Sequence, residues 1–236
     1  MKSFLKKYPP AFDFFKYLSR KLGNRTELYI QLKPFFDIHK DFSFIQIGAN
    51  DGISNDPFRE FILQDVARGV IVEPQSNEFY KLKNNYIRKE GKIHFENCAI
   101  SYTHKQITIF VVDEDFLKIS RDAESLSGVA SFEKDHVLKH IGINNEKYVK
   151  SINVPCKTIE DLQSEHSFKS FDCIFMDVEG YEYDILSNMS FELIKPKLIV
   201  FESKHLGNKQ KELSQFLEYK KYRLSVCDQD TIAIKE

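Results

Sequence analysis

Short apolar runs alternate with amphipathic segments along most of the 236-residue chain. Apolar runs bounded by turn residues are typical of buried strands, and apolar positions three or four residues apart are typical of helices. Strands are predicted at FSFIQIG (42–48), RGVIVEP (68–74), KIHFENCAIS (92–101), QITIFVV (106–112), FDCIFMDVEG (171–180) and KLIVFES (197–203). Helices are predicted at PFREFILQDVA (57–67), SNEFYKLKNNYIRK (76–89), KTIEDLQSE (157–165), YEYDILSNM (181–189) and KQKELSQFLEYK (209–220).

This alternation predicts an α/β fold with a mostly parallel sheet covered by helices on both faces. The closing segment 222–236 reads as two strands around a turn, which adds an antiparallel edge. Ser76 is predicted to cap its helix, and Thr158 with Asp161 forms a capping-box pattern. Such sheets bind ligands beyond the carboxyl ends of their strands, so functional residues are expected there.

The first 40 residues differ from the rest and are predicted to form a helical extension. The segments AFDFFKYLSRKL (11–22) and TELYIQLKPFF (26–36) carry apolar residues at helical spacing. Thr26 is a candidate cap for the second helix, and Pro34 is expected to end or bend it. We interpret this extension as a cover on the main domain, 41–236, and as a surface through which a homo-oligomer could form.

Composition narrows the class of protein. Hydrophobic residues make up 42 %, enough for one sizeable core. The 34 basic and 35 acidic residues nearly cancel, which argues against a nucleic-acid partner. The four cysteines form no CxxC pair, so reduced, packed thiols are expected. No segment has the length of a signal peptide or membrane span, and the expected location is the cytoplasm.

The loop GANDG after the first predicted strand is the first candidate for binding chemistry. Gly48 and Gly52 would let the backbone approach a ligand closely, although they do not form the G-x-G-x-x-G pattern of dinucleotide enzymes. A simple turn explains the loop equally well. Glu73 ends the next strand, 21 residues after Gly52, at an offset where a carboxylate meets ribose hydroxyls in nucleotide-binding folds.

Acidic residues also follow two later strands. Asp177 and Glu179 leave the buried run CIFM, and Glu182 begins the next helix. Glu202 and His205 follow the apolar run KLIVF (197–201). Carboxylates at such positions need a partner, so they are candidates for holding magnesium, binding an amino group or acting as a general base.

Two further stretches border the expected site. Asn97, Cys98 and Ala99 follow a predicted strand and are candidates to line an adenine pocket, although the triplet also reads as ordinary loop. The polar stretch 113–150 is interpreted as a lid or insertion over the substrate. Its candidate contacts are Ser125, Ser127, Lys134 and His136.

The segments QIGANDG, VEP, NCAIS, TIEDL and IFMDVEGYEYDIL, in this order, resemble the FkbM-type methyltransferases. The resemblance covers residues 42–234 and implies the class I fold that uses S-adenosylmethionine, a Rossmann-like sheet of seven strands with an antiparallel last strand. It implies a cofactor site at Gly48, Asn50, Asp51, Gly52, Glu73, Pro74, Asn97, Cys98, Ala99 and Asp177. Gln46 departs from the acid that many methyltransferases of this fold carry before the glycine loop, so Asp51 or Asp177 is expected to hold the cofactor's ammonium.

The resulting prediction is methyl transfer from S-adenosylmethionine to a hydroxyl of a small acceptor, a sugar or glycoconjugate precursor. Asp177, Glu179, Glu202 and His205 are the candidate catalytic residues, with a divalent metal such as magnesium as an optional cofactor. Two alternatives stay open. One is a nicotinamide-dependent oxidoreductase, against which the missing G-x-G-x-x-G counts. The other is a catalytically silent module that binds a partner through its aromatic N-terminal helices.

Overall fold

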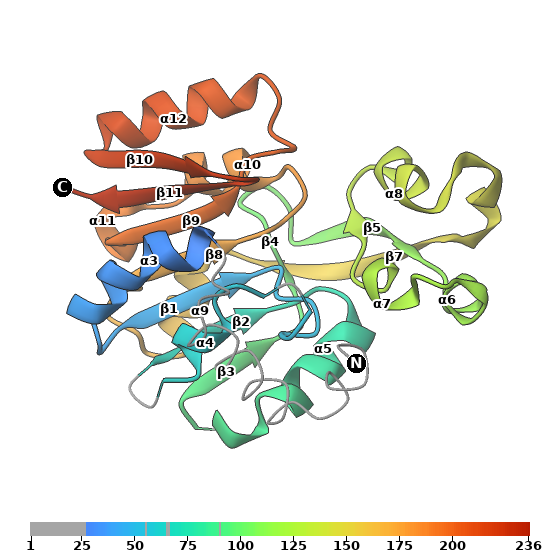
Figure 1. Cartoon of the computed structure of the whole chain (residues 1–236), viewed down its shortest axis with the longest axis horizontal. Coiled ribbons are helices and arrows are strands. Elements are labelled where there is room, and N and C mark those ends of the chain that lie inside the picture. Colours follow the sequence, from blue (N-terminus) through green and yellow to red (C-terminus); the bar gives the residue numbers. More distant parts are fainter. Residues whose placement is uncertain (1–26, 55, 65–66, 90) are drawn as a thin grey trace.

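The computed structural model describes residues 27–236 except 55, 65–66 and 90 (Figure 1). The predicted helix at 11–22 and the candidate cap Thr26 therefore lie outside the described residues. Within them, no helix combines the length and apolar character needed to cross a bilayer. The four cysteines are free thiols, three of them buried.

A seven-stranded sheet with strand order β10-β11-β9-β8-β1-β2-β3 forms the centre of the fold. The five strands from β9 to β3 are parallel, and β11 runs antiparallel to both of its neighbours. This confirms the predicted mostly parallel sheet with an antiparallel last strand. The strands are β1 (Ser43–Ile47), β2 (Arg68–Val72), β3 (Ile93–Glu96), β8 (Cys173–Met176), β9 (Leu198–Glu202), β10 (Tyr222–Cys227) and β11 (Asp230–Lys235).

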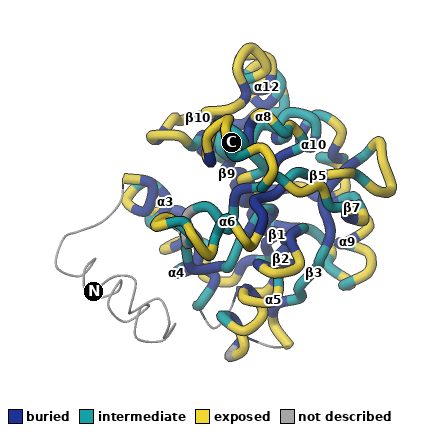
Figure 2. Tube along the Cα trace, turned by 90° about the vertical axis from the view of Figure 1, so that its right-hand side faces the viewer, coloured by how far each residue is buried: buried dark blue, intermediate teal, exposed yellow. Residues whose placement is uncertain are grey.

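Alternate residues of the central strands feed two hydrophobic layers, one on each face of the sheet. In β1, Phe44 packs with α3, α4 and α5, whereas Ile45 and Ile47 pack with α9 to α12. Figure 2 shows β1 and β9 as largely buried and the outer turns as exposed. The helices are α3 (Glu27–Ile38), α4 (Arg59–Ile62), α5 (Ser76–Asn85), η1 (Ile87–Lys89), α9 (Ile159–Glu165), α10 (Glu182–Asn188), α11 (Phe191–Ile194) and α12 (Lys209–Tyr219).

Helix α3 covers one face of the sheet through an aromatic cluster. Phe36 stacks on Phe61 with ring centroids 4.2 Å apart, and Tyr29 stacks on Phe61 at 5.1 Å. Pro34 was expected to end or bend this helix; it does not end it, because the helix continues to Ile38. A proline inside a helix costs about 3 kcal/mol. Burial of the two phenylalanines at 35 and 36, each contributing roughly 1.5–3 kcal/mol, offsets that cost.

Two predicted helix starts have different outcomes. The capping box of Thr158 and Asp161 is confirmed, since each side chain accepts a hydrogen bond from the backbone N–H of the other. Ser76 is not a cap. It is the first residue of α5, and its hydroxyl donates to Asn97 Oδ1 at 3.0 Å instead of capping the helix. The predicted helix at 57–67 is shorter than expected, because α4 covers only Arg59–Ile62.

Residues 99–157 build an arm beside the main sheet (Figure 1). Strand β5 pairs antiparallel with β7 along its whole length, and β7 also pairs with β4. The arm is thus larger than the predicted insertion at 113–150, because its flanking strands belong to it. Its elements are β4 (Ala99–Ile100), β5 (Gln106–Val112), α6 (Glu114–Ile119), α7 (Ala123–Leu126), β6 (Ala130–Ser131), α8 (Lys134–Ile141), η2 (Ile143–Tyr148) and β7 (Val149–Lys157).

Candidate functional site

A cleft of about 460 Å³ lies beyond the carboxyl ends of β1, β2, β8 and β9. Strand β1 has β2 on one side and β8 on the other, so the strand order reverses at this point of the sheet. This is the position at which open α/β sheets bind ligands. The arm supplies the opposite wall through Ile109 and the segment 128–132.

The loop after β1 forms the floor of the cleft. Gly48 has φ +76°, and a Cβ built there would lie 1.8 Å from the carbonyl oxygen of Asp177. Only glycine therefore allows the ends of β1 and β8 to approach so closely. Asn50, also at positive φ, donates its backbone N–H to Glu73 Oε2 at 2.8 Å. Gly52 faces α5 instead, because a Cβ there would lie 2.5 Å from Leu82 Cδ1.

Glu73 is buried at the end of β2, with 3 % of its surface exposed, and it lines the cleft. Its two carboxylate oxygens accept the backbone N–H groups of Asn50 and Gln75, both at 2.8 Å. Burial, partly offset by these two donors, raises the pKa of Glu73 to about 7. Each carboxylate oxygen keeps a second lone pair, so the side chain can still accept hydrogen bonds from a ligand.

Two residues expected at the cofactor lie behind the cleft and organise its loops. The Asp51 carboxylate accepts the backbone N–H groups of Ile53 and Ser54 and the Ser54 hydroxyl. The Asn97 amide donates to the backbone carbonyls of Glu73 and Pro74, at 2.8 and 3.1 Å. The expected cofactor residues that do line the cleft are Gly48, Asn50, Glu73, Pro74, Cys98, Ala99 and Asp177.

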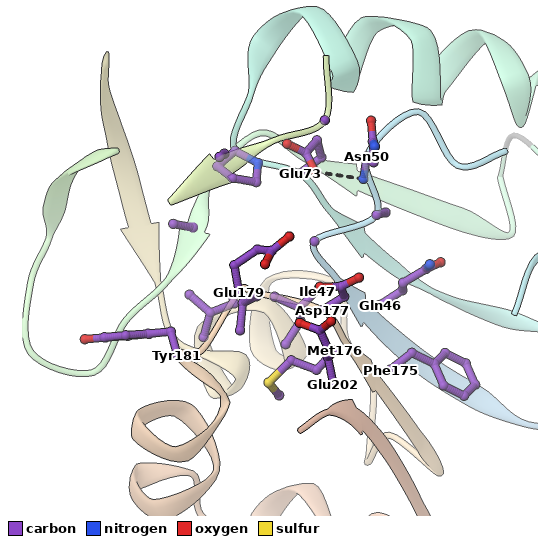
Figure 3. A pocket seen from close by; sticks show the side chains of 18 of the residues that line it. Gln46, Ile47, Asn50, Glu73, Phe175, Met176, Asp177, Glu179, Tyr181 and Glu202 are labelled. Atoms are coloured by element: carbon purple, nitrogen blue, oxygen red, sulfur yellow. Dashed lines mark hydrogen bonds between the residues drawn. The ribbon is translucent and has the colours of Figure 1, made fainter. Parts of the chain in front are cut away.

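The expected acids after β8 and β9 meet at the other side of the cleft from Glu73 (Figure 3). Oxygens of Asp177, Glu182 and Glu202 lie within 4.8 Å of one another. Glu182 is fully buried at the start of α10, and its Oε1 accepts the Val178 N–H at 3.0 Å. Asp177, open to the cleft, and Glu179 line it beside Glu202.

Burial and mutual repulsion make these acids hard to ionise. Desolvation, followed by the charges of Asp177 and Glu179, raises the pKa of Glu202 to about 8. Desolvation raises the pKa of Glu182 to about 7, and it also raises the pKa of Asp177 with help from Glu179. Such shifts near neutral pH are typical of functional sites.

Several oxygens beside the cleft are buried without a hydrogen-bond partner. They are Gln46 Oε1, Glu179 Oε2, Glu182 Oε2 and Glu202 Oε2. Buried polar atoms of this kind are costly unless a ligand, ion or water pairs with them.

The charge of the cleft is of one sign. Among the described residues that line it there is no Lys, Arg or His, whereas its acidic lining residues are Asp56, Glu73, Asp177, Glu179, Glu202 and Asp230. A lining of this composition attracts a cation and repels phosphate groups.

One contact between the arm and the loops of the cleft was not predicted. Gly128 lies against Asn50, since a Cβ there would be 1.9 Å from Asn50 Nδ2, and its carbonyl accepts a hydrogen bond from Gln75 Nε2 at 3.1 Å. Lys134, a suggested substrate contact, pairs with Glu146 within the arm. The side chain of Ser125 is not among those described.

The predicted residue His205 lies outside the lining, at the rim. Its Nε2 is 3.4 Å from Glu179 Oε2 and 3.8 Å from Glu202 Oε2. Burial lowers its pKa, which favours the neutral imidazole. His136 of α8 approaches the same Glu179 oxygen at 3.1 Å from the arm.

Comparison with models of known protein families gives a match over most of the chain. The model of the methyltransferase FkbM domain matches residues 46–224, which is more than half of the chain. None of the curated proteins searched matches the chain.

Several solved structures match the chain at low sequence identity. An FkbM methyltransferase from Methylobacillus flagellatus KT is 14 % identical, with a TM-score of 0.49; the match covers 82 % of this chain but 43 % of that one. A candidate caffeoyl-CoA O-methyltransferase from Staphylococcus aureus is 11 % identical, with a TM-score of 0.49 and coverage of 93 % and 91 %. An O-methyltransferase from Bacillus cereus in complex with SAH is 13 % identical, with a TM-score of 0.45 and coverage of 88 % and 80 %.

Proposed function

Because the chain belongs to the FkbM methyltransferase family, we propose that it transfers a methyl group from S-adenosylmethionine to a hydroxyl of a small acceptor. A sugar or glycoconjugate precursor is the acceptor class that we favour. The observation that carries the proposal is the acidic cleft at the point where the strand order reverses, which has no basic residue among its described lining. S-adenosylmethionine is a cation at sulfur and carries an ammonium group, so this lining suits it.

The residues present fit the cofactor in three places. Glu73 keeps free lone pairs at the end of β2, where a ribose would bind. Cys98, Ala99 and Val129 all line the cleft, and their small apolar side chains suit an adenine ring. Asp177 is the expected partner of the ammonium, since the Asp51 carboxylate is taken up by its own loop.

The acids around β9 are proposed to receive the proton of the acceptor. Methyl transfer requires mainly that the nucleophile be aligned with the departing sulfur and that water be excluded. A hydroxyl nucleophile also needs a base, and a base works best when its pKa lies near the working pH. Glu202, with a pKa of about 8, meets this condition and lines the cleft.

The same electrostatics argue against a nicotinamide cofactor. Its pyrophosphate carries negative charge and is usually held by backbone N–H groups of a glycine-rich turn or by cations. Here the cleft presents acids instead. A thermal-shift panel should therefore show stabilisation by S-adenosylmethionine and S-adenosylhomocysteine and none by NAD; stabilisation by NAD alone would reverse this ranking.

The decisive experiment combines binding with turnover. Isothermal titration should show S-adenosylmethionine binding, and Asp177→Asn should weaken it about 10- to 100-fold, because a hydrogen bond to a charged group is worth roughly 1.5–3 kcal/mol. Glu165→Gln, an exposed acid on α9, serves as the matched control and should leave affinity unchanged.

Turnover is tested by incubating the chain with methyl-labelled cofactor and a cell extract, then identifying the labelled product by mass spectrometry. A product labelled on a hydroxyl oxygen supports the proposal. Cofactor binding without any labelled product favours the catalytically silent module, and a product labelled on nitrogen or carbon contradicts the hydroxyl acceptor.

A further inference from the structure

A cluster of two histidines and one glutamate joins the arm to the rim of the cleft. His136 lies on α8 of the arm, Glu179 follows β8, and His205 follows β9. Glu179 Oε2 is 3.1 Å from His136 Nε2 and 3.4 Å from His205 Nε2. Three segments far apart in sequence thus direct one donor atom each toward a common point.

Hydrogen bonding alone accounts poorly for this arrangement. A ring nitrogen offers one in-plane site, which is either a hydrogen or a lone pair. His136 Nε2 nevertheless lies within 3.3 Å of both Glu179 Oε2 and His140 Nε2. Glu179 Oε2 itself is buried and has no hydrogen bond of acceptable geometry, although two imidazoles surround it.

The separations match a coordination sphere. Imidazole nitrogens and carboxylate oxygens bind zinc at about 2.0–2.2 Å, which places neighbouring ligand atoms roughly 3.0–3.6 Å apart. The two measured separations from the glutamate oxygen fall in this range, and all three ligand atoms lie within 4.8 Å of one another.

The backbone holds the glutamate in place at some cost. Glu179 has φ +54°, a conformation that costs a non-glycine residue about 1 kcal/mol or more. The next residue, Gly180, lies against the backbone of His205, since a Cβ there would be 3.3 Å from the His205 carbonyl oxygen. This close approach brings Glu179 to the His205 side chain.

We propose that His136, Glu179 and His205 bind a divalent transition-metal ion that fastens the arm to the rim of the cleft. Two imidazoles and one carboxylate suit zinc, manganese, iron or cobalt, whereas magnesium and calcium prefer oxygen ligands throughout. His140 and Glu202 flank the three ligands.

Metal binding is tested directly, without reference to methyl transfer. The full chain is stripped with a chelator and titrated with Zn²⁺, Mn²⁺ and Mg²⁺ by calorimetry, and Co²⁺ loading is followed by its visible d–d absorbance. One Zn²⁺ per chain is expected, with no measurable Mg²⁺ binding at this site. The same assay can succeed even if the protein transfers no methyl group.

The variants His136→Ala, Glu179→Gln and His205→Ala should each weaken Zn²⁺ binding at least tenfold and abolish the Co²⁺ band. The control is His104→Ala. His104 is an exposed histidine between β4 and β5 of the arm, and its loss should change neither the Zn²⁺ affinity nor the Co²⁺ band. Melting curves separate binding from folding, since Zn²⁺ should raise the Tm of the wild type and not that of the three variants.

Two results would overturn the proposal. One is the absence of stoichiometric Zn²⁺ binding by the stripped, folded chain. The other is binding that survives all three variants but disappears in His166→Ala, because His166 belongs to a second group of potential ligands with Glu96 and Glu165.

Discussion

The buried acids on the two sides of the cleft differ in how completely they are hydrogen-bonded. On the β2 side, Glu73 is buried but both of its oxygens accept backbone hydrogen bonds. On the β8 and β9 side, Glu182 and Glu202 each retain a buried oxygen without a partner. Burial raises the pKa of Glu73 and of Glu182 alike, to about 7, so the difference lies in hydrogen bonding: the first side satisfies its acid without a ligand, whereas the second leaves buried oxygens unpaired.

We call the β2 side, with Glu73, the scaffold side, and the β8 and β9 side, with Glu182 and Glu202, the reactive side. A fully hydrogen-bonded acid fixes the positions of the loops around it, so its loss should affect folding as much as binding. An acid with an unpaired buried oxygen contributes little to the folded state, so its loss should impair chemistry without harming stability. Substitutions of the acids on the two sides should therefore change the free energy of unfolding in opposite directions.

The largest effect on the free energy of unfolding is expected at Gly48, where the end of β1 meets the end of β8. Gly48→Ala places a Cβ 1.8 Å from the Asp177 carbonyl oxygen at a φ of +76°, so the ends of β1 and β8 must separate. We expect a loss of about 3 kcal/mol or more in the free energy of unfolding, measured by chemical denaturation. Gly207→Ala is the matched control, because Gly207 also has positive φ but no atom within 4 Å of its built Cβ. A loss there as large as at Gly48 would mean that backbone strain alone matters.

On the scaffold side, Glu73→Gln should lower the free energy of unfolding by about 1–3 kcal/mol. The amide replaces one accepting oxygen with a donor, which then faces the backbone N–H of Asn50 or Gln75. Urea denaturation at pH 5 measures the change, because below the raised pKa of Glu73 its ionisation does not weaken the wild type. Glu218→Gln, on the exposed surface of α12, should have almost no effect. A Glu73 variant as stable as the wild type would show that the two hydrogen bonds are dispensable.

On the reactive side, Glu202→Gln should do the opposite. The pKa of Glu202 is about 8 in the folded chain and near the usual glutamate value when unfolded, so the folded state binds more protons between these values. The free energy of unfolding therefore falls as the pH rises through this window. At pH 8.5 the variant should be more stable than the wild type by roughly 0.5–2 kcal/mol, and near pH 4 the two should coincide.

Activity completes that test. If Glu202 is the base, the stabilised variant should lose methyl transfer while still binding S-adenosylmethionine. Denaturation curves at pH 4, 6 and 8.5 supply the stability, and transfer of labelled methyl supplies the rate. A variant that is less stable than the wild type at pH 8.5 would erase the distinction between the two sides.

How far the sequence predicts these features depends on how local their causes are. The sheet follows from apolar runs such as CIFM and from caps such as Thr158, which are properties of neighbouring residues. Glu73, Asp177 and Glu202 were predictable because each lies at or just after the carboxyl end of a strand, and parallel strands end at one edge of a sheet.

Other features depend on contacts between distant segments and leave no local pattern. The approach of Gly128 to Asn50 and of His136 to Glu179 exists only once the arm is folded against the sheet. The sequence also does not distinguish the roles of the two glycines in the loop after β1. Gly48 faces the end of β8, whereas Gly52 four residues later packs on α5, and the sequence gives both the same appearance.

The smallest expected effect is the pH dependence of cofactor binding. Below pH 7 the raised pKa values of Glu182 and Glu202 keep these acids largely protonated, so they attract a cation less strongly. Between pH 6 and 8.5 the affinity for S-adenosylmethionine should rise by about three- to tenfold, in line with 1.4 kcal/mol per tenfold change. S-adenosylhomocysteine lacks the sulfonium charge, so its affinity should rise less. Calorimetric titrations of both ligands across this range measure the two slopes. Equal slopes of affinity against pH for the two ligands would place the sulfur away from Glu182 and Glu202. The base would then have to lie elsewhere in the cleft.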